Sequence, residues 1–163
     1  MKVIALYGKA NTGKTSALNT VAEGLKAGGA TIIETVKNDF DTADRRYLIK
    51  LADGRMVCIT TAGDDAETQE AKFIFVKKCK PEIWITASHE RDESADPVKD
   101  SYREGYSDHV TWIRKLYPMV IIQNEKDYKY KNDEPPLFLE SICDRLNRID
   151  SARILNMIFQ ETT

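Results

Sequence analysis

Hydrophobic residues come in blocks along the chain, and the spacing inside the blocks switches between the pattern of a strand and that of a helix. The first block is a continuous apolar run over residues 3–7 that stops at Gly8, which is typical of a strand buried on both faces. Residues 14–27 then carry apolar side chains at helical spacing, and the glycine pair after them ends that helix. The short β-branched segment 31–36 predicts a second strand.

The middle of the chain predicts a hairpin, a helix and a further strand. The apolar runs 47–51 and 56–61 flank an Asp-Gly turn, and such a turn between two runs is a strong hairpin signal. Residues 65–79 suit a helix, because apolar side chains recur there among charged ones. The run over 83–87 predicts a fifth strand.

The last part of the chain is more varied. Residues 88–107 are highly charged and predict a loop or a mobile flap. The remaining predictions are a helix that Asp108 caps and that carries Val110, Ile113 and Leu116, a sixth strand over 119–122, a helix or a short edge strand over 137–147, and a terminal helix over 151–160. Trp84 and Trp112 are expected in the core.

Strands that alternate with helices predict an α/β fold. We expect three layers, with a mostly parallel sheet of five or six strands, one antiparallel hairpin, and helices on both faces. The length of 163 residues fits one domain spanning 1–163, and no linker or internal repeat interrupts it.

Composition narrows the function classes. The 24 Lys and Arg against 26 Asp and Glu give a net charge of −2, so no strong nucleic-acid signature is present. No apolar run is long enough to span a membrane, and the N-terminal run is too short for a signal peptide. Three scattered cysteines and two histidines argue against a disulfide framework or a metal cage. We therefore expect a reduced, cytoplasmic protein.

The segment Gly8 to Thr15, GKANTGKT, matches the pattern GxxxxGK[ST] at every fixed position, directly after a buried strand and at the start of a helix. Its glycines allow a loop whose N–H groups point at phosphate oxygens, and the helix start adds a positive dipole end. Lys14 would reach the β- and γ-phosphates, and the Thr15 hydroxyl would bind Mg²⁺. The plainer alternative is a glycine-rich turn that only joins strand to helix. The predicted binding residues are Gly8, Lys9, Ala10, Asn11, Thr12, Gly13, Lys14, Thr15 and Ser16.

With this complete Walker A motif the chain resembles the P-loop NTPase superfamily. The resemblance implies that superfamily's fold over nearly the whole chain, and binding of a nucleoside triphosphate with Mg²⁺ through Gly8 to Thr15. It leaves the reaction open, because hydrolases, kinases and regulatory switches share the motif.

Two further segments resemble motifs of Ras-like GTPases, each with a departure. The strand 56–61 is followed by a turn similar to their DTAG turn, with Thr60 in place of the aspartate. Residues 118–127 resemble their guanine-reading strand, but Asn124-Glu125-Lys126-Asp127 displaces the lysine of NKxD by one position. ATP is therefore expected rather than GTP.

Carboxylates near strand ends are the candidate catalytic acids. Asp64 and Asp65 could hold a Mg²⁺-bound water or orient the nucleophile, or they could simply cap the next helix. Asp39 and Asp41 could hold a substrate or metal, or belong to a polar loop.

Other polar side chains also have two interpretations. Ser88, His89 and Arg91 could sense the γ-phosphate, or begin an ordinary charged loop. Lys99 and Arg103 could close over phosphates as a basic lid, or lie on a solvated face, because acidic residues outnumber them there. The loop with Lys126, Lys129, Lys131, Tyr128 and Tyr130 could contact a base, or be an exposed connection.

The sequence thus predicts a Mg²⁺-dependent nucleoside-triphosphate-binding protein that hydrolyses ATP, with Lys14, Asp64 and Asp65 as catalytic residues and Thr15 as metal ligand. A small-molecule or nucleotide kinase, with the segment 88–107 as lid, is the first alternative. A nucleotide-regulated binding module with negligible turnover is the second. The acceptor, the pathway and any protein partner are not indicated.

Overall fold

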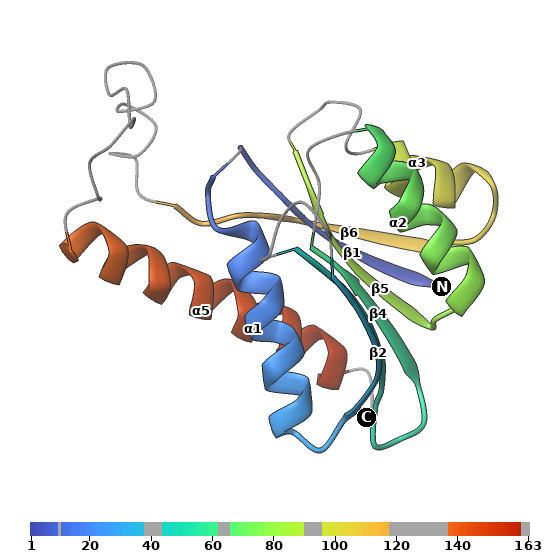
Figure 1. Cartoon of the computed structure of the whole chain (residues 1–163), viewed down its shortest axis with the longest axis horizontal. Coiled ribbons are helices and arrows are strands. Elements are labelled where there is room, and N and C mark those ends of the chain that lie inside the picture. Colours follow the sequence, from blue (N-terminus) through green and yellow to red (C-terminus); the bar gives the residue numbers. More distant parts are fainter. Residues whose placement is uncertain (10, 38–43, 62–65, 90–95, 118–136, 161–163) are drawn as a thin grey trace.

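Six strands form one sheet in the order β2-β3-β4-β5-β1-β6 (Figure 1). The coordinates are a computed structural model that describes residues 1–9, 11–37, 44–61, 66–89, 96–117 and 137–160. The strands are β1 (Lys2–Tyr7), β2 (Thr31–Lys37), β3 (Arg45–Lys50), β4 (Met56–Thr60), β5 (Ile83–Ser88) and β6 (His109–Arg114).

The sheet is mostly parallel in strand direction, and β3 is the strand that runs against the others. Parallel pairing joins β4 to β5, β5 to β1 and β1 to β6. The pairings of β3 with β2 and with β4 are both antiparallel. The predicted α/β class, mostly parallel sheet and antiparallel hairpin are confirmed. Because β3 is reversed, its first residues lie at the edge where the parallel strands end.

Within the described residues, four helices cover the two faces of the sheet: α1 (Lys14–Ala27), α2 (Ala66–Cys79), α3 (Asp96–Arg103) and α5 (Leu137–Phe159). In Figure 1, α1 and α5 lie on one side of the strands, and α2 and α3 lie on the other. Successive residues of β1 divide between the two cores, as the period of two in a strand requires. Ile4 and Leu6 join the core under α1 and α5, whereas Val3 and Ala5 join the core with Val98 of α3.

The predicted helix after Asp108 is wrong, because residues 109–114 form the edge strand β6. Their β-branched and aromatic side chains favour a strand, and each residue pairs in register with β1. Val110 faces one core and Ile113 faces the other, which is alternation rather than a helical stripe. Trp112, expected in the core, is consequently 43% exposed at the sheet edge. Trp84 is fully buried as predicted.

The charged segment 88–107 is only partly the loop that was predicted. Residues 96–103 form α3, which buries Val98 and Ser101. At the C-terminus, the two segments predicted separately form the single helix α5. The predicted strand over 119–122 lies outside the described residues. No described helix has the length and apolar character needed to cross a membrane.

Candidate functional site

The glycine-rich loop joins β1 to α1 at the carboxyl edge of the sheet. Asn11 and Gly13 both have left-handed backbone conformations, with φ of 56° and 86°. Such a turn directs successive N–H groups into one concavity. Gly13 is the N-cap of α1 and supplies no capping side chain, so the positive end of the helix dipole faces this concavity. The local geometry therefore suits an anion.

Lys14 is folded back over the loop. Its ammonium donates hydrogen bonds to the carbonyl oxygens of Gly8 (2.9 Å) and Lys9 (2.6 Å), and the residue is only 7% exposed. The Thr12 hydroxyl donates to the same Lys9 carbonyl at 2.8 Å. These hydrogen bonds hold the Lys14 ammonium over the loop, where it can rotate toward an anion that binds there.

The carboxylate of Asp44, the residue just before β3, contacts the Thr15 hydroxyl at the start of α1. Thr15 Oγ1 lies 3.0 Å from Asp44 Oδ1 and 3.3 Å from the carbonyl oxygen of Thr61. The Thr61 hydroxyl donates to the same Asp44 oxygen at 3.1 Å and accepts a bond from the backbone N–H of Arg45. Asp44 therefore accepts from two hydroxyls, and the three residues form one oxygen-rich cluster beside the loop.

Asp44 was missed by the sequence analysis, which singled out Asp39 and Asp41 in the same connection. It directly precedes β3, and the reversed direction of β3 brings this position to the carboxyl edge of the neighbouring strands. If β3 ran parallel to β4, Asp44 would lie at the other edge of the sheet, where the parallel strands begin. The hairpin turn was a usable signal, because it already implied that the strand before the turn was reversed.

Thr60, which replaces the aspartate of the DTAG-like turn, bonds to β5 and not to the glycine-rich loop. Its fully buried hydroxyl donates to Thr86 Oγ1 at 2.8 Å and accepts from Trp84 Nε1 at 3.0 Å. The ammonium of Lys72, also buried, donates to the Ala87 carbonyl at 2.9 Å. These hydrogen bonds link β4, β5 and α2 beneath the carboxyl edge of the sheet. Thr61, the residue after Thr60, contacts Thr15 instead.

Both fixed glycines of the loop lie close to side chains from later parts of the chain. A Cβ atom on Gly8 would lie 3.1 Å from Lys115 Cβ. One on Gly13 would lie 2.6 Å from Asn147 Oδ1, and the left-handed φ of Gly13 adds strain to any substitution. Asn147, on α5, is 8% exposed, and its Oδ1 has no hydrogen-bond partner. Thus α5 packs directly against the loop.

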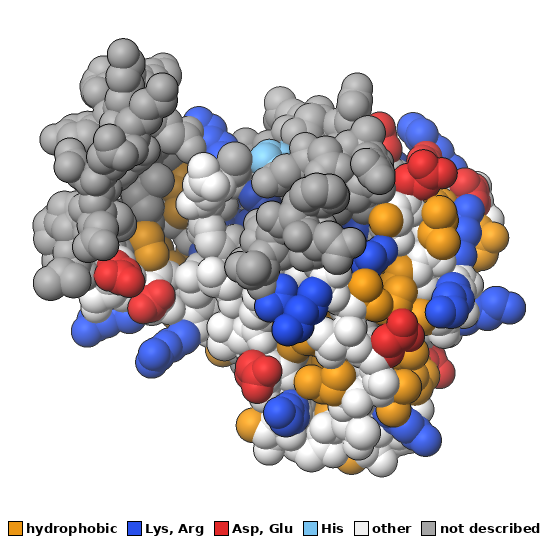
Figure 2. All heavy atoms as spheres, viewed as in Figure 1, with side chains coloured by type: hydrophobic (Ala, Val, Ile, Leu, Met, Phe, Trp, Pro, Cys, Tyr) orange, Lys and Arg blue, Asp and Glu red, His pale blue; other side chains and the backbone are white. Residues whose placement is uncertain are grey.

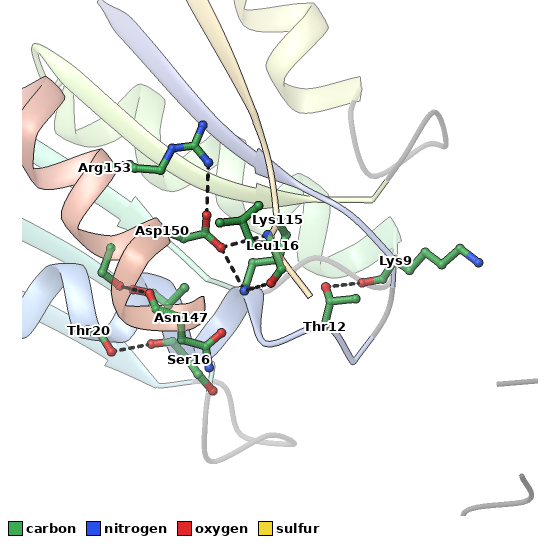
Figure 3. Close-up of polar contacts among 11 residues, drawn as sticks. Lys9, Thr12, Ser16, Thr20, Lys115, Leu116, Asn147, Asp150 and Arg153 are labelled. Carbon is green, nitrogen blue, oxygen red and sulfur yellow. Dashed lines mark hydrogen bonds and ion pairs between the residues drawn. The ribbon is translucent and has the colours of Figure 1, made fainter. Parts of the chain in front are cut away.

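A buried ion pair holds α5 in this position. Figure 3 shows the carboxylate of Asp150, on α5, directed at Lys115 and Leu116, which follow β6. Asp150 is fully buried and lies 3.0 Å from the ammonium of Lys115, which is 1% exposed. The same carboxylate accepts the N–H of Leu116 at 3.0 Å and pairs with Arg153 at 3.4 Å. The next residue of α5, Ser151, donates a hydrogen bond from its hydroxyl to the Ala17 carbonyl of α1 at 2.7 Å.

Of the remaining residues predicted for the site, some lie within the described part of the chain and others do not. Ala10, Asp39, Asp41, Asp64, Asp65, Arg91 and the loop around Tyr128 lie outside the described residues. Lys9, Asn11 and Ser16 are exposed at the loop and the start of α1. The carbonyl of Ser88 accepts the N–H of Gly8 at 3.2 Å, but its buried hydroxyl donates to the carbonyl of His89.

The two predicted lid residues lie on α3 instead of a loop. Lys99 pairs with Asp96 at 3.2 Å, and Arg103 pairs with Asp100 at 3.3 Å. Figure 2 shows charges of both signs interspersed on the side of the molecule where α2 and α3 lie. Both pairs lie within α3, whereas the buried Val98 packs the helix against the core. We therefore assign Lys99 and Arg103 to a charged helix face.

The cluster at Thr15 has donors of the kind that Mg²⁺ prefers, because a hydroxyl and a carboxylate are hard oxygen ligands. Mg²⁺ commonly takes one or two protein oxygens and completes its shell with phosphate and water. Within the described part of the chain, no group of three or more His, Cys, Asp or Glu could hold a metal by itself. Thr15 and Asp44 thus fit a metal that arrives with a phosphate ligand.

Comparisons of the chain with protein families, with curated proteins and with solved structures gave no significant match.

Proposed function

We propose that the chain is a P-loop protein that binds a nucleoside triphosphate with Mg²⁺ and hydrolyses it, with ATP as the substrate. The observation that carries the proposal is the meeting of four features at one point. The left-handed turn at Asn11 and Gly13, the start of α1, the Lys14 ammonium and the Thr15–Asp44 pair all lie at the carboxyl edge of the sheet. A turn that only connected β1 to α1 would need neither the ammonium nor the carboxylate.

Each residue has a role that follows from its chemistry. The loop N–H groups and the Lys14 ammonium would bind the phosphate oxygens and stabilise the charge that develops during transfer. For this, Lys14 would exchange its two carbonyl partners for phosphate oxygens, which as charged acceptors bind it more strongly. Bound Mg²⁺ would supply charge neutralisation between the phosphates.

The metal would be held through Thr15 and Asp44. The Thr15 oxygen can bind the metal through a lone pair while its proton stays directed at Asp44 Oδ1. Thr61 would fix the orientation of the carboxylate through its own hydroxyl. In this arrangement Asp44, rather than a residue at the end of β4, supplies the negative charge next to the metal.

The test is calorimetric titration of ATP with Mg²⁺ into the wild type and Lys14→Ala, together with phosphate release. We expect the variant to lose binding or turnover while its circular dichroism stays unchanged. Lys26→Ala, exposed in the last turn of the same helix, is the matched control and should behave as the wild type. Equal ATP affinity in the wild type and Lys14→Ala would end the proposal.

Further arms of the same assay address the base and the reaction. Because the displaced lysine in 124–127 departs from the guanine-reading motif, ATP should compete at least as well as GTP, and a clear preference for GTP would contradict this. Phosphate release only with pooled small-molecule acceptors would favour a kinase. Binding without any turnover would favour a nucleotide-regulated module.

A further inference from the structure

A pocket lies between the end of α2 and the turn after α3, at the edge of the sheet where the parallel strands begin (Figure 1). Its volume of about 300 Å³ is at the lower end of the range for small-molecule sites. Two lysines, Lys77 and Lys80, are the charged side chains in its lining. The glycine-rich loop follows the other end of β1, so this pocket is separate from the site proposed above.

The ring of Tyr106 is held at the pocket by the way in which α3 ends. Gly105 has a φ of 76°, and its N–H donates to the carbonyl of Tyr102. The N–H of Tyr106 donates to the Ser101 carbonyl at 2.8 Å. These bonds form a Schellman motif with glycine at the left-handed position. The Tyr106 ring then contacts Phe73 of α2 edge to face, with ring centroids 5.9 Å apart. Backbone geometry therefore places one aromatic wall of the pocket.

The ammonium of Lys77 is positioned by these two rings. It lies 4.0 Å from the centroid of the Phe73 ring and 5.0 Å from that of the Tyr106 ring, which are cation–π distances. It also donates a hydrogen bond to Glu104 at 2.8 Å. Because an ammonium has three N–H donors, Lys77 can bind a second acceptor without leaving the rings or Glu104.

Lys80 has a strained backbone conformation at the rim of the pocket. Its φ of 47° is left-handed, and among the described residues other than glycine only Asn11 of the glycine-rich loop shares that feature. Its N–H donates to the Val76 carbonyl at 2.9 Å and ends α2, at a position where glycine is usual. The exposed Lys80 ammonium makes no hydrogen bond or ion pair within the described part of the chain. Strain of this kind clusters at binding sites, which indicates a role for the lysine side chain.

We propose that this pocket binds a small aromatic carboxylic acid. The aromatic ring of the ligand packs against the buried Val76 and Pro81, with the Tyr106 ring, 46% exposed, beside it. The carboxylate accepts charge-assisted hydrogen bonds from the ammonium groups of Lys77 and Lys80. An apolar body with a few convergent polar groups is the usual composition of a small-molecule site.

The charges around the pocket favour a carboxylate over a phosphate. Within the described part of the chain, its lining contains the two lysines and no acidic side chain. Two carboxylates lie just outside the lining: Glu104 pairs with Lys77, and Asp108 lies 3.4 Å from the N-terminal ammonium of Met1. After these two pairs, the charge of Lys80 is left uncompensated. One positive charge complements a carboxylate, whereas a phosphate monoester carries nearly two negative charges.

The first test is titration of cinnamate into the isotope-labelled full chain without nucleotide, followed by nuclear magnetic resonance. We expect saturable binding with a Kd at or below about 1 mM, and amide shifts concentrated in residues 73–81 and 104–107. Cinnamamide, which lacks the charge, and acetate, which lacks the ring, should each bind at least about fivefold more weakly. Absence of saturable binding, shifts located elsewhere, or equal affinity for cinnamamide would overturn the proposal.

Lys80→Gly then separates binding from structure. The variant removes the ammonium and relieves the left-handed strain, so the melting temperature of the free protein should hold or rise. Its affinity for cinnamate should nevertheless fall at least about fivefold. Lys78→Ala is the matched control, because Lys78 is exposed in the same last turn of α2 and lies outside the lining. Undiminished affinity in Lys80→Gly, or an equal loss in Lys78→Ala, would refute the assignment.

Discussion

Asp44→Asn separates the charge of Asp44 from its hydrogen bonds. An asparagine Oδ1 can still accept from Thr15 at 3.0 Å and from Thr61 at 3.1 Å, so the cluster keeps its geometry. Only the negative charge is removed. The variant therefore tests whether the carboxylate serves a metal or merely ties β3 to α1.

The expected effect of Asp44→Asn on ATP affinity has opposite signs with and without metal. A carboxylate that supports a metal ligand contributes about 10–100-fold to metal affinity, which corresponds to about 1.4–2.7 kcal/mol. We expect Mg²⁺ to promote ATP binding to Asp44→Asn that much less effectively than to the wild type. In metal-free solution the same variant should bind ATP slightly more tightly, because a carboxylate beside a triphosphate repels it.

The assay is titration of Mg²⁺ at fixed ATP, followed by a parallel ATP titration in a chelator. Asp53→Asn is the matched control, because Asp53 lies in the hairpin turn and its carboxylate accepts from Arg55 at 2.8 Å. That variant should match the wild type in both titrations. If Asp44→Asn needs the same Mg²⁺ concentration as the wild type, Asp44 is a structural cross-link and the metal shell has been assigned to the wrong residue.

Three further predictions concern the support of the loop and the core. Asp150→Asn should lower the free energy of unfolding by about 3–5 kcal/mol, because it leaves the Lys115 ammonium buried without its counter-charge; urea denaturation should show a smaller loss in Lys115→Met/Asp150→Asn than in Asp150→Asn alone. Gly13→Ala should lower the free energy of unfolding by about 1–2 kcal/mol through backbone strain at φ 86°, and further through the contact with Asn147. Adding Asn147→Ala should relieve only that contact. Full recovery of stability in the double variant would refute the backbone strain. Burial raises the pKa of the Cys58 thiol well above its ordinary value, so iodoacetamide at neutral pH should leave Cys58 unmodified until the protein is unfolded, as peptide mass spectrometry can check.

Features that depend on neighbouring residues were predictable. The strand, loop and helix around the glycine-rich motif occur where the pattern predicts them, and so does the hairpin between β3 and β4. In both cases the signal lies within one stretch of chain: an apolar run, a helical stripe, or a turn with glycine at positive φ. Residues 109–114 show the limit, because six residues with mixed spacing fitted a helix until pairing with β1 made them a strand.

The sequence by itself determined which short segments bury their side chains and where the glycine-rich loop lies, because periodicity and glycine positions act locally. Only the tertiary structure decided what lies beside that loop. The contact of Asp44 with Thr15 spans 29 residues and depends on the reversal of β3. The packing of Asn147 against Gly13 depends on α5 returning to α1 from the far end of the chain. Such contacts follow from the order and direction of strands, which are set by the packing of all the segments together.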